Sequence, residues 1–154
     1  MVIEKIIGNI YEYDNVSKTV DVVTVEWYER EKKRMRKTSL NGEEIGIAVD
    51  VPLNDGDIIF ENEQKIIVVE FAPCELIKIN VATMKEMGRL CFELGNRHRS
   101  LSISEDYVTI PFDDTDFAYL EHIGFRPQKI FGKFSDFTVC KAHGENHTHL
   151  HHHE

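Results

Sequence analysis

Apolar and polar residues alternate over much of the first half of the chain. The alternation runs from Val23 to Trp27 and again from Ile45 to Val51. It places every second side chain on one face, as a half-buried β-strand requires. Turn signals stand at Asn41-Gly42 and at Asn54-Asp55-Gly56. Because no helical period occurs in residues 1–73, we expect this region to form an all-β sandwich or small barrel.

Two shorter patterns complete this first region. The apolar segments 58–60 and 66–71 flank the polar sequence ENEQ, which is typical of a hairpin. Residues 29–37, EREKKRMRK, carry dense charge of both signs. Mixed-charge runs are usually solvated, so we expect a strand end or a hairpin tip there.

After Pro73, which we take as a domain boundary, the pattern changes to a mixture of strands and helices. A strand at 77–81 precedes a helix that starts at Thr83, and two alternating segments at 101–103 and 108–110 follow. Asp113 or Asp114 can cap a second helix that Gly124 closes, and 125–131 offers a last strand, at an edge because of Pro127. The order β-α-β-β-α-β over 74–140 predicts a ferredoxin-like domain, and the chain is expected to be α+β.

The helix from Thr83 has the strongest local signals. Thr83 and Glu86 fit a capping box, and an apolar stripe follows at steps of three and four: Met84, Met87, Leu90, Cys91 and Leu94. We expect Gly95 or Asn96 to take the left-handed conformation that ends a helix. His98, the only histidine before residue 122, would then stand just beyond a rigid element.

Composition excludes several classes of protein. The 154 residues carry a formal net charge of -9 and are 42% hydrophobic, enough for a core. An acidic chain suits cations and argues against a nucleic-acid partner. No apolar run approaches a membrane span, and the start of the chain lacks a signal-peptide layout. Three cysteines, Cys74, Cys91 and Cys140, form no C-x-x-C pair, which favours reduced thiols and a cytoplasmic location.

Residues 141–154, KAHGENHTHLHHHE, have no apolar face and are predicted to form a flexible, disordered tail. They hold six of the eight histidines: His143, His147, His149, His151, His152 and His153. Imidazole is the commonest protein ligand for metals and suits nickel, zinc and copper. A purification tag is the alternative, but tags are usually uninterrupted, whereas Thr148 and Leu150 interrupt this run.

His98 by itself cannot close a metal site, because one imidazole is too few ligands. In a two-fold dimer, two copies of His98 could share one ion. The apolar stripe of the preceding helix could supply the dimer face or pack on its own sheet, and both can hold. We expect Cys91 on that stripe to be an inert thiol and His122 to be a surface residue.

The segment Glu86 to His98, EMGRLCFELGNRH, together with the histidine-rich end, resembles the UreE family of urease accessory nickel chaperones. The resemblance implies a homodimer through the C-terminal domains, with nickel between the two copies of His98 and the tail histidines completing or extending the site. It further implies a peptide-binding type of N-terminal domain, and delivery to the urease apoprotein through a UreG-type GTPase and other accessory proteins. Some members have a histidine pair on the strand after this motif, but residues 107–111 contain none, so that peripheral site is expected to be absent.

Three other functions fit parts of the pattern. A general nickel or zinc buffer or storage protein would share the histidine-rich end but would have no dedicated recipient. An RNA-binding module of the RRM type has the same element order, yet the aromatic signature is missing and the chain is acidic. A metallohydrolase needs three fixed ligands and a base, which cannot be assembled here. A non-catalytic Ni2+ carrier fits best, with Zn2+ or Cu2+ able to bind in vitro.

Overall fold

The computed structural model describes residues 1–139, and Cys140 and the histidine-rich segment lie outside the described residues. The chain divides into two compact units, Met1–Pro73 and Cys74–Glu154. The α+β class predicted from the sequence is confirmed, with a β-rich first unit and a second unit that combines a sheet with helices.

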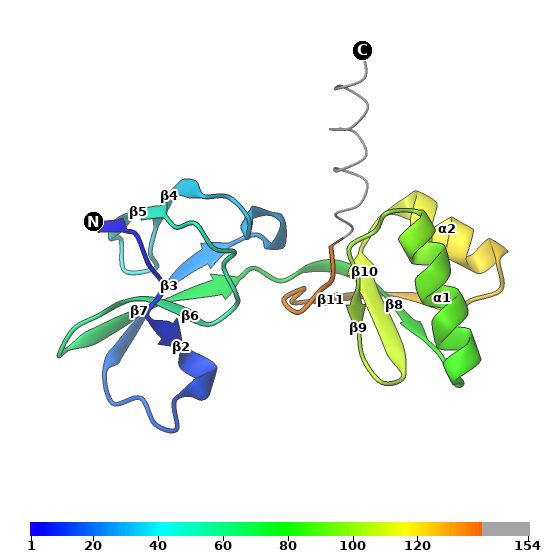
Figure 1. The fold of residues 1–154 in the computed structure, drawn as a ribbon, viewed down its shortest axis with the longest axis horizontal. Helices are drawn as coiled ribbons and strands as arrows, with labels where there is room; N and C mark the ends of the chain where they lie inside the picture. Colours follow the sequence, from blue (N-terminus) through cyan, green and yellow to red (C-terminus); the bar gives the residue numbers. More distant parts are fainter. Residues whose placement is uncertain (140–154) are drawn as a thin grey trace, which may run out of the picture. The chain divides into compact units, whose positions relative to one another are not determined.

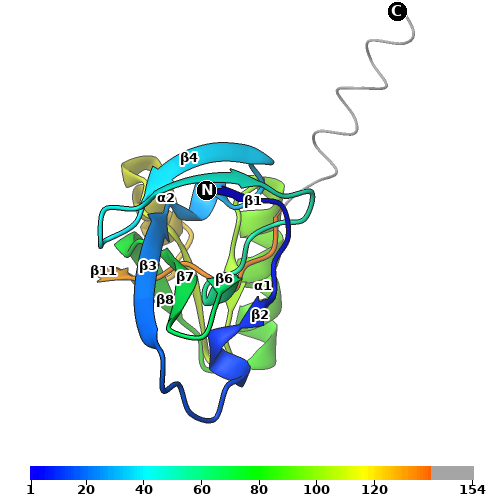
Figure 2. The ribbon, with the colours of Figure 1, turned by 90° about the vertical axis from the view of Figure 1, so that its left-hand side faces the viewer.

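The first unit is built from two small sheets, which Figure 2 shows with this unit facing the viewer. One sheet has the strand order β1-β5-β4 and the other β2-β6-β7-β3. The bounds are β1 Val2–Ile3, β2 Gly8–Asn9, β3 Thr19–Val25, β4 Arg34–Thr38, β5 Glu44–Ala48, β6 Asp57–Glu61 and β7 Lys65–Phe71. Two 3-10 helices, η1 (Ile10–Glu12) and η2 (Trp27–Glu29), lie beside the strands.

Most of the local signals of the first unit produce the expected elements. The β6–β7 hairpin is antiparallel, and the turn residues Gly42 and Gly56 have φ values of 91° and 87°, a region open to glycine. Strand β3 begins before the alternating segment, at Thr19, and ends at Val25, because Trp27 belongs to η2. The pairings of β3 with β7 and of β1 with β5 are parallel and long-range, which no local pattern indicates.

The charged run at 29–37 is not wholly solvated, so that expectation was wrong for its first residue. Glu29 is buried, and its carboxylate lies 2.8 Å from the Lys37 ammonium. Burial alone would raise the pKa of Glu29, but hydrogen bonds from Lys37 and the Glu26 backbone, with the charges of Lys37 and Lys32, outweigh it and lower the pKa. The run therefore contributes an ion pair to the packed part of the unit.

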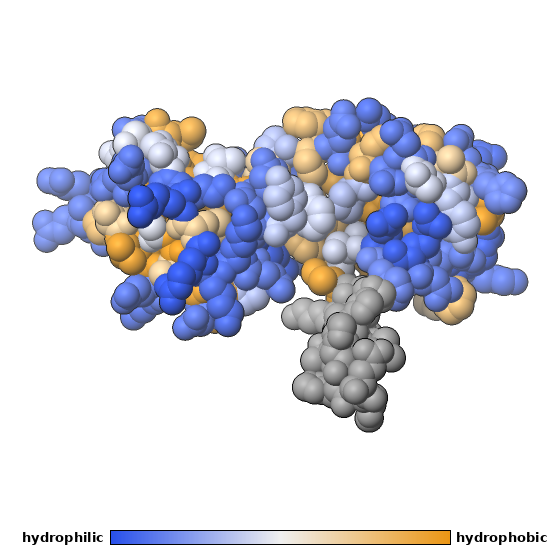
Figure 3. Space-filling view, turned by 90° about the horizontal axis from the view of Figure 1, so that it is seen from above, coloured by the Kyte–Doolittle hydropathy of each residue, from blue (hydrophilic) through white to orange (hydrophobic). Residues whose placement is uncertain are grey.

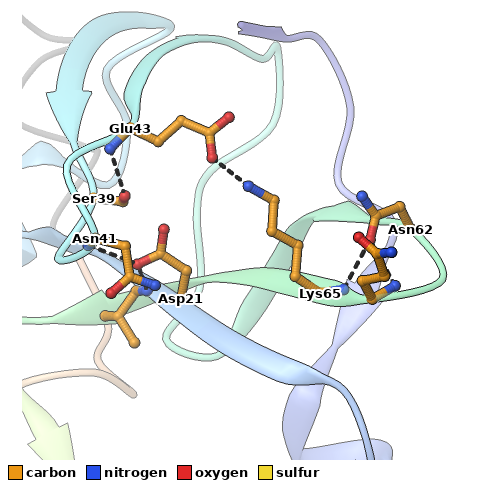
Figure 4. Close-up of polar contacts among 8 residues, drawn as sticks. Asp21, Ser39, Asn41, Glu43, Asn62 and Lys65 are labelled. Atoms are coloured by element: carbon orange, nitrogen blue, oxygen red, sulfur yellow. Dashed lines mark hydrogen bonds and ion pairs between the residues drawn. The ribbon is translucent and has the colours of Figure 1, made fainter.

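A buried carboxylate, Asp21, joins the two sheets of this unit (Figure 4). It lies on β3 and accepts hydrogen bonds from the backbone N–H groups of Val22 and of Asn41, at 2.9 and 3.1 Å. Asn41 belongs to the turn between β4 and β5 of the other sheet. A second link between the sheets runs from Lys65 at the start of β7 to Glu43 before β5.

The second unit is a four-stranded antiparallel sheet with the order β11-β8-β10-β9. In Figure 1 both helices lie on the same side of this sheet. The bounds are β8 Cys74–Asn80, α1 Met84–Asn96, β9 Ser102–Ile103, β10 Tyr107–Pro111, α2 Asp114–His122 and β11 Pro127–Gly132. The predicted β-α-β-β-α-β order is therefore confirmed, with β11 at an edge.

Helix α1 attaches to this sheet through two leucines. Leu90 and Leu94 are fully buried in a core cluster that otherwise comes from the strands, from Leu101 and from α2. Its remaining buried members are Ile77, Ile79, Val81, Leu101, Val108, Ile110 and Leu120. Burying a leucine side chain contributes about 1.5–3 kcal/mol, so the pair is a strong anchor for the helix.

The two helices begin at the predicted caps. Thr83 accepts a hydrogen bond from the backbone N–H of Glu86, and Asp113 accepts one from that of Asp116. The return half of the capping box is shifted by one residue, because the Glu86 carboxylate accepts from the N–H of Ala82. The hydrogen bonds accepted by Thr83 and Asp113 each satisfy a donor that a helix start would leave unpaired.

The segment after β11 returns to the second unit before the described residues end. Phe134 is buried and stacks on Phe137, with ring centroids 4.5 Å apart. Thr138 then forms an isolated antiparallel bridge with Leu101, through backbone hydrogen bonds of 2.8 and 3.1 Å. On the face drawn in Figure 3, hydrophilic residues predominate and hydrophobic ones form separate patches.

The Asp21 network gives a testable dependence of stability on pH. Burial would raise the pKa of this carboxyl, but hydrogen bonds from Ser39, Asn41 and Val22 and the charge of Lys65 outweigh burial and lower the pKa. Since the folded value lies below the unfolded one, the stabilisation is present at neutral pH and is lost as the pH falls through the folded value. Asp21→Asn should lower the free energy of unfolding by about 1–3 kcal/mol at pH 7.

The difference between the two proteins should shrink on acidification, which urea unfolding at pH 7 and at about pH 3, on either side of the ordinary aspartate pKa, would measure. The matched control is Asp50→Asn, which changes an exposed acid. An undiminished difference at low pH would contradict the assignment of this stabilisation to the ionised Asp21.

Candidate metal centre

His98 stands at the end of α1, in the left-handed conformation that closes the helix. Its φ is 57°, and among residues 1–139 no other non-glycine residue has a positive φ. The N–H of His98 bonds to the carbonyl of Gly95, and the N–H of Arg99 bonds to the carbonyl of Leu94. These two bonds form a Schellman motif with His98 at the position that glycine usually occupies.

The expectation that Gly95 or Asn96 would take the left-handed conformation was therefore wrong. Both residues are inside α1, whose cap residue is Arg97. A left-handed conformation costs a non-glycine residue roughly 1–2 kcal/mol, although histidine tolerates it better than most. The cost falls on His98, a residue that the sequence analysis named as a candidate ligand, and strained conformations of this kind cluster at functional sites.

His98 is exposed to solvent, whereas its neighbours Arg97 and Arg99 form ion pairs with a carboxylate on α2. Arg97 and Arg99 both reach Asp116, a carboxylate in the first turn of α2 whose side chain is 2% exposed. The Nε of Arg97 donates a hydrogen bond of 3.0 Å to Oδ1, and the Nε of Arg99 lies 2.7 Å from Oδ2. The second contact is an ion pair whose geometry is not that of a hydrogen bond.

Sequence reasoning missed this carboxylate and its two arginines. The only available signal was the symmetrical placement of arginine on either side of His98, together with the three acidic residues at the start of the second helix. Nothing in that signal selects Asp116 over its acidic neighbours Asp113 and Asp114. The choice follows from helix geometry, because residue 116 is the one that faces inward in the first turn of α2.

Residues 1–139 do not contain a complete metal site. Within this part of the chain, no group of three or more histidine, cysteine, aspartate or glutamate side chains could hold an ion. The second histidine here, His122, is exposed on α2, as expected. The other predicted ligands, His143, His147, His149, His151, His152 and His153, lie outside the described residues, as does Cys140. The structure thus places one of the predicted ligands, His98, and does not place the rest.

The apolar stripe of α1 divides between the core and the surface. Leu90 and Leu94 are buried, and Met87 and Cys91 pack partly against the same core. Met84, by contrast, is 90% exposed. Burial raises the pKa of the Cys91 thiol, which keeps it protonated and a poor ligand at neutral pH.

A second row of residues on α1 faces outward, and the sequence analysis missed its largest member. Met84, Gly88 and Phe92 follow one another at intervals of four, which places them on one helix face. Phe92 is 66% exposed, and a Cβ added to Gly88 would meet no atom within 4 Å. We call Met84, Gly88 and Phe92 the outer row of α1. It runs toward the end of the helix at which His98 lies.

Thr138, near the end of the described residues, is connected to the segment that follows His98. Thr138 is paired with Leu101, which follows His98 by three residues. A fully extended backbone spans at most ~3.6 Å per residue. Leu101, three residues after His98, therefore lies within ~11 Å of it. The five residues from Thr138 to His143 span at most ~18 Å. The lengths therefore permit a histidine of the same chain to reach His98.

Among the described residues, no helix has the length and apolar character needed to cross a membrane.

Because of the backbone strain at His98, replacing this residue by glycine should raise the stability of the second unit and weaken metal binding. His98→Gly should raise the free energy of unfolding of the second unit by about 1 kcal/mol, because glycine adopts a positive φ without a steric penalty. The same change removes the imidazole. The control is Asn96→Gly, at the last helical residue, which should lower stability by up to about 1 kcal/mol. Thermal unfolding of the three proteins checks both signs, and a destabilised His98→Gly would contradict the role given to this conformation.

Comparison with known proteins covers both units of the chain. Residues 3–72 match the family described as UreE urease accessory protein, N-terminal domain, and residues 74–154 match the C-terminal domain of the same family. A urease accessory protein UreE from Bifidobacterium longum subsp. infantis is 43% identical over 144 residues, which are 93% of this chain and 65% of that protein. The chain thus spans slightly less than two thirds of that relative.

Two other relatives match over nearly their whole length. The urease accessory protein UreE of Flavobacterium johnsoniae is 34% identical over 95% of this chain and 92% of its own. That of Acetivibrio thermocellus is 36% identical over 98% of this chain and 100% of its own. The matches therefore extend across both units and are not confined to the segment around His98.

Proposed function

Because the chain belongs to the UreE family of urease accessory proteins, we propose that it is a metallochaperone that binds Ni2+ and delivers it for assembly of the urease active site. The observation that carries the proposal is the placement of His98, an exposed imidazole held at the closed end of α1 in a family that serves urease. Imidazole is a suitable ligand for nickel, and Zn2+ and Cu2+ would compete for it in vitro. The chain acts as a carrier and not as a catalyst.

The proposed site needs ligands from more than one place. No described group of three ligands exists within residues 1–139, so His98 of one chain is completed by His98 of a second chain and by histidines of the C-terminal segment. A two-fold axis brings identical patches together, which gives two imidazoles from one position. The candidates in the C-terminal segment are His143, His147, His149, His151, His152 and His153.

The outer row of α1 is the surface that we propose for the homodimer. An exposed phenylalanine and methionine on one helix face commonly mark an interaction site. Gly88 between them lets another backbone approach closely. The occupant is a second copy of this chain, because a shared ion at His98 requires His98 of the partner to lie near the same end of the helix.

Phe92→Asp should therefore weaken the metal-free dimer. Loss of a central aromatic contact typically costs 2 kcal/mol or more, which corresponds to at least a ~30-fold rise in the dimer dissociation constant. Light scattering over a range of concentrations measures it. The matched control is Phe131→Asp, because Phe131 is similarly exposed, at 69%, but lies on β11. An unchanged Phe92→Asp dimer would place the interface elsewhere.

Delivery would proceed to a UreG-type GTPase and from there to the urease apoprotein with its accessory proteins. The N-terminal unit, a two-sheet β structure, is the part that we assign to contacts with those partners, as a peptide-binding type of domain. A cytoplasmic location suits this route. It is in keeping with the free thiol of Cys91, which reducing compartments preserve.

Nickel titration tests the ligand assignment. His98→Ala should abolish the tightest binding event and leave weaker binding by the C-terminal histidines, because an anchored ligand loses less entropy on binding than ligands that must be ordered. A chain ending at Ala142 removes all six candidate histidines of the C-terminal segment. It should bind fewer ions per dimer and keep the first event. Calorimetry measures both, and an unchanged first event in His98→Ala would exclude His98 as a ligand.

The alternative is a nickel or zinc buffer or storage protein with no dedicated recipient, which the histidine-rich segment equally favours. The unmodified chain, His98→Ala and the chain ending at Ala142 distinguish the two functions. For each of them, the arrival of nickel on a purified UreG-type GTPase is followed over time. A chaperone should transfer nickel faster than the ion dissociates into a chelator. Transfer no faster than free dissociation would identify a buffer.

A further inference from the structure

The two residues that flank His98 in the sequence both form ion pairs with one buried carboxylate, that of Asp116. Arg97 and Arg99 converge on the two oxygens of the Asp116 carboxylate, one arginine to each oxygen, at 3.0 and 2.7 Å. Asp116 itself belongs to the first turn of α2, where its N–H is capped by Asp113. The Asp116 carboxylate on α2 thus holds the residue before His98 and the residue after it, and these two contacts restrain the backbone conformation of His98.

These ion pairs are weak sources of stability, because burying the Asp116 carboxylate costs free energy that offsets much of the attraction, and the side chains of Arg97 and Arg99 are themselves 27% and 39% exposed. They are better suited to selecting one geometry. Here the geometry in question is a positive φ that costs free energy at every residue but glycine. Groups behind a metal ligand that fix its orientation commonly change metal affinity by 10–100-fold when they are altered.

A purely structural role, in which Asp116 only joins α1 to α2, is a weaker explanation. The two helices are already joined by other contacts. Tyr119 donates a hydrogen bond of 2.6 Å to Glu93, Arg89 donates one to the carbonyl of Ile123, and Leu120 is buried in the same core as Leu94. The Asp116 contacts differ from these because both arginines adjoin the histidine.

We propose that Asp116 is a positioning residue for the metal site: through Arg97 and Arg99 it holds His98 in the left-handed conformation that presents the imidazole. The inference rests on the proposed function for the identity of the metal, Ni2+, but not for the conformational effect. The effect is present in the metal-free protein, in which the His98 backbone conformation can be measured directly.

The experiment uses the full chain with Asp116→Asn and Arg99→Gln. The control is Glu29→Gln, which weakens a buried ion pair in the other unit. In the metal-free proteins, the three-bond coupling between the His98 amide proton and Hα, with the Cα shift, reports the sign of φ. Nickel affinity is measured by calorimetry and the dimer by light scattering. Both test variants should lose the left-handed signature and bind nickel ~10–100-fold more weakly while remaining dimeric.

Arg99→Gln separates positioning from simple electrostatics. Removing a positive charge near a cation site should strengthen nickel binding if charge alone matters, whereas loss of positioning should weaken it. Asp116 keeps its Arg97 partner in this variant, so no buried charge is left unpaired. If Asp116→Asn fails to fold, Arg99→Gln still decides the question. The Glu29→Gln control should lose stability but retain the His98 signature and the wild-type nickel affinity.

Two outcomes would overturn the inference: a His98 signature retained in both variants, or nickel binding by Arg99→Gln that equals or exceeds that of the unmodified chain. His98→Ala is measured alongside. If that variant binds nickel as tightly as the unmodified chain, the proposed nickel site fails, while the backbone signature still reports on the positioning role of Asp116.

Discussion

The burial of Leu90 and Leu94 against the sheet of the second unit is the contact on which the rest of the site depends. Both side chains are fully buried, and they stand four residues apart on one face of α1. Two such anchors fix the rotation of a helix and its position along its axis. His98 follows Leu94 by four residues, equivalent to ~6 Å of helical rise. The place of the candidate ligand is therefore set by hydrophobic packing, before any polar contact is considered.

The end of α1 shows how a fold can support a histidine at an unfavourable backbone position. A glycine at the closing position would cost less, but it would carry no imidazole. The chain instead places histidine there, and the Schellman hydrogen bonds of His98 and Arg99 satisfy the last carbonyls of the helix. The strain is small beside the packing of two buried leucines, which explains how the second unit can tolerate it.

Local sequence signals accounted for the elements of the fold better than for their ends and partners. The caps Thr83 and Asp113 and the turn at Gly42 act through neighbouring residues, so the sequence reveals them directly. The end of α1 was misplaced, because glycine at 95 is only a weak stop signal and the bonds that close the helix lie further on. The burial of Glu29 was missed because its partner Lys37 is brought to it by tertiary structure.

The candidate site likewise contains one residue that the sequence reveals and others that only the fold brings together. His98 could be selected from the sequence, because it follows a strongly marked helix and stands apart from the other histidines. Asp116 could not, since its contacts with Arg97 and Arg99 join residues 19 and 17 positions apart, respectively, through the packing of two helices. The exposure of Met84 was also missed, because the periodicity places it on the same stripe as Leu90 and Leu94, whereas in the fold it is 90% exposed at the start of α1.

The incompleteness of the site within one described chain bears on how a carrier can release its ion. A resident structural metal is usually enclosed by four ligands of one fold, and such an ion leaves slowly. Here the described residues of each chain offer one candidate ligand, His98, at a helix end, and the remaining candidates follow Thr138 in the sequence, which is paired to Leu101. Ligands tethered beside an anchored pair act at high effective concentration and can replace one another singly. Under the proposed function, the ion can then pass to a recipient without a bare intermediate, a property that a closed four-ligand site in a single chain would lack.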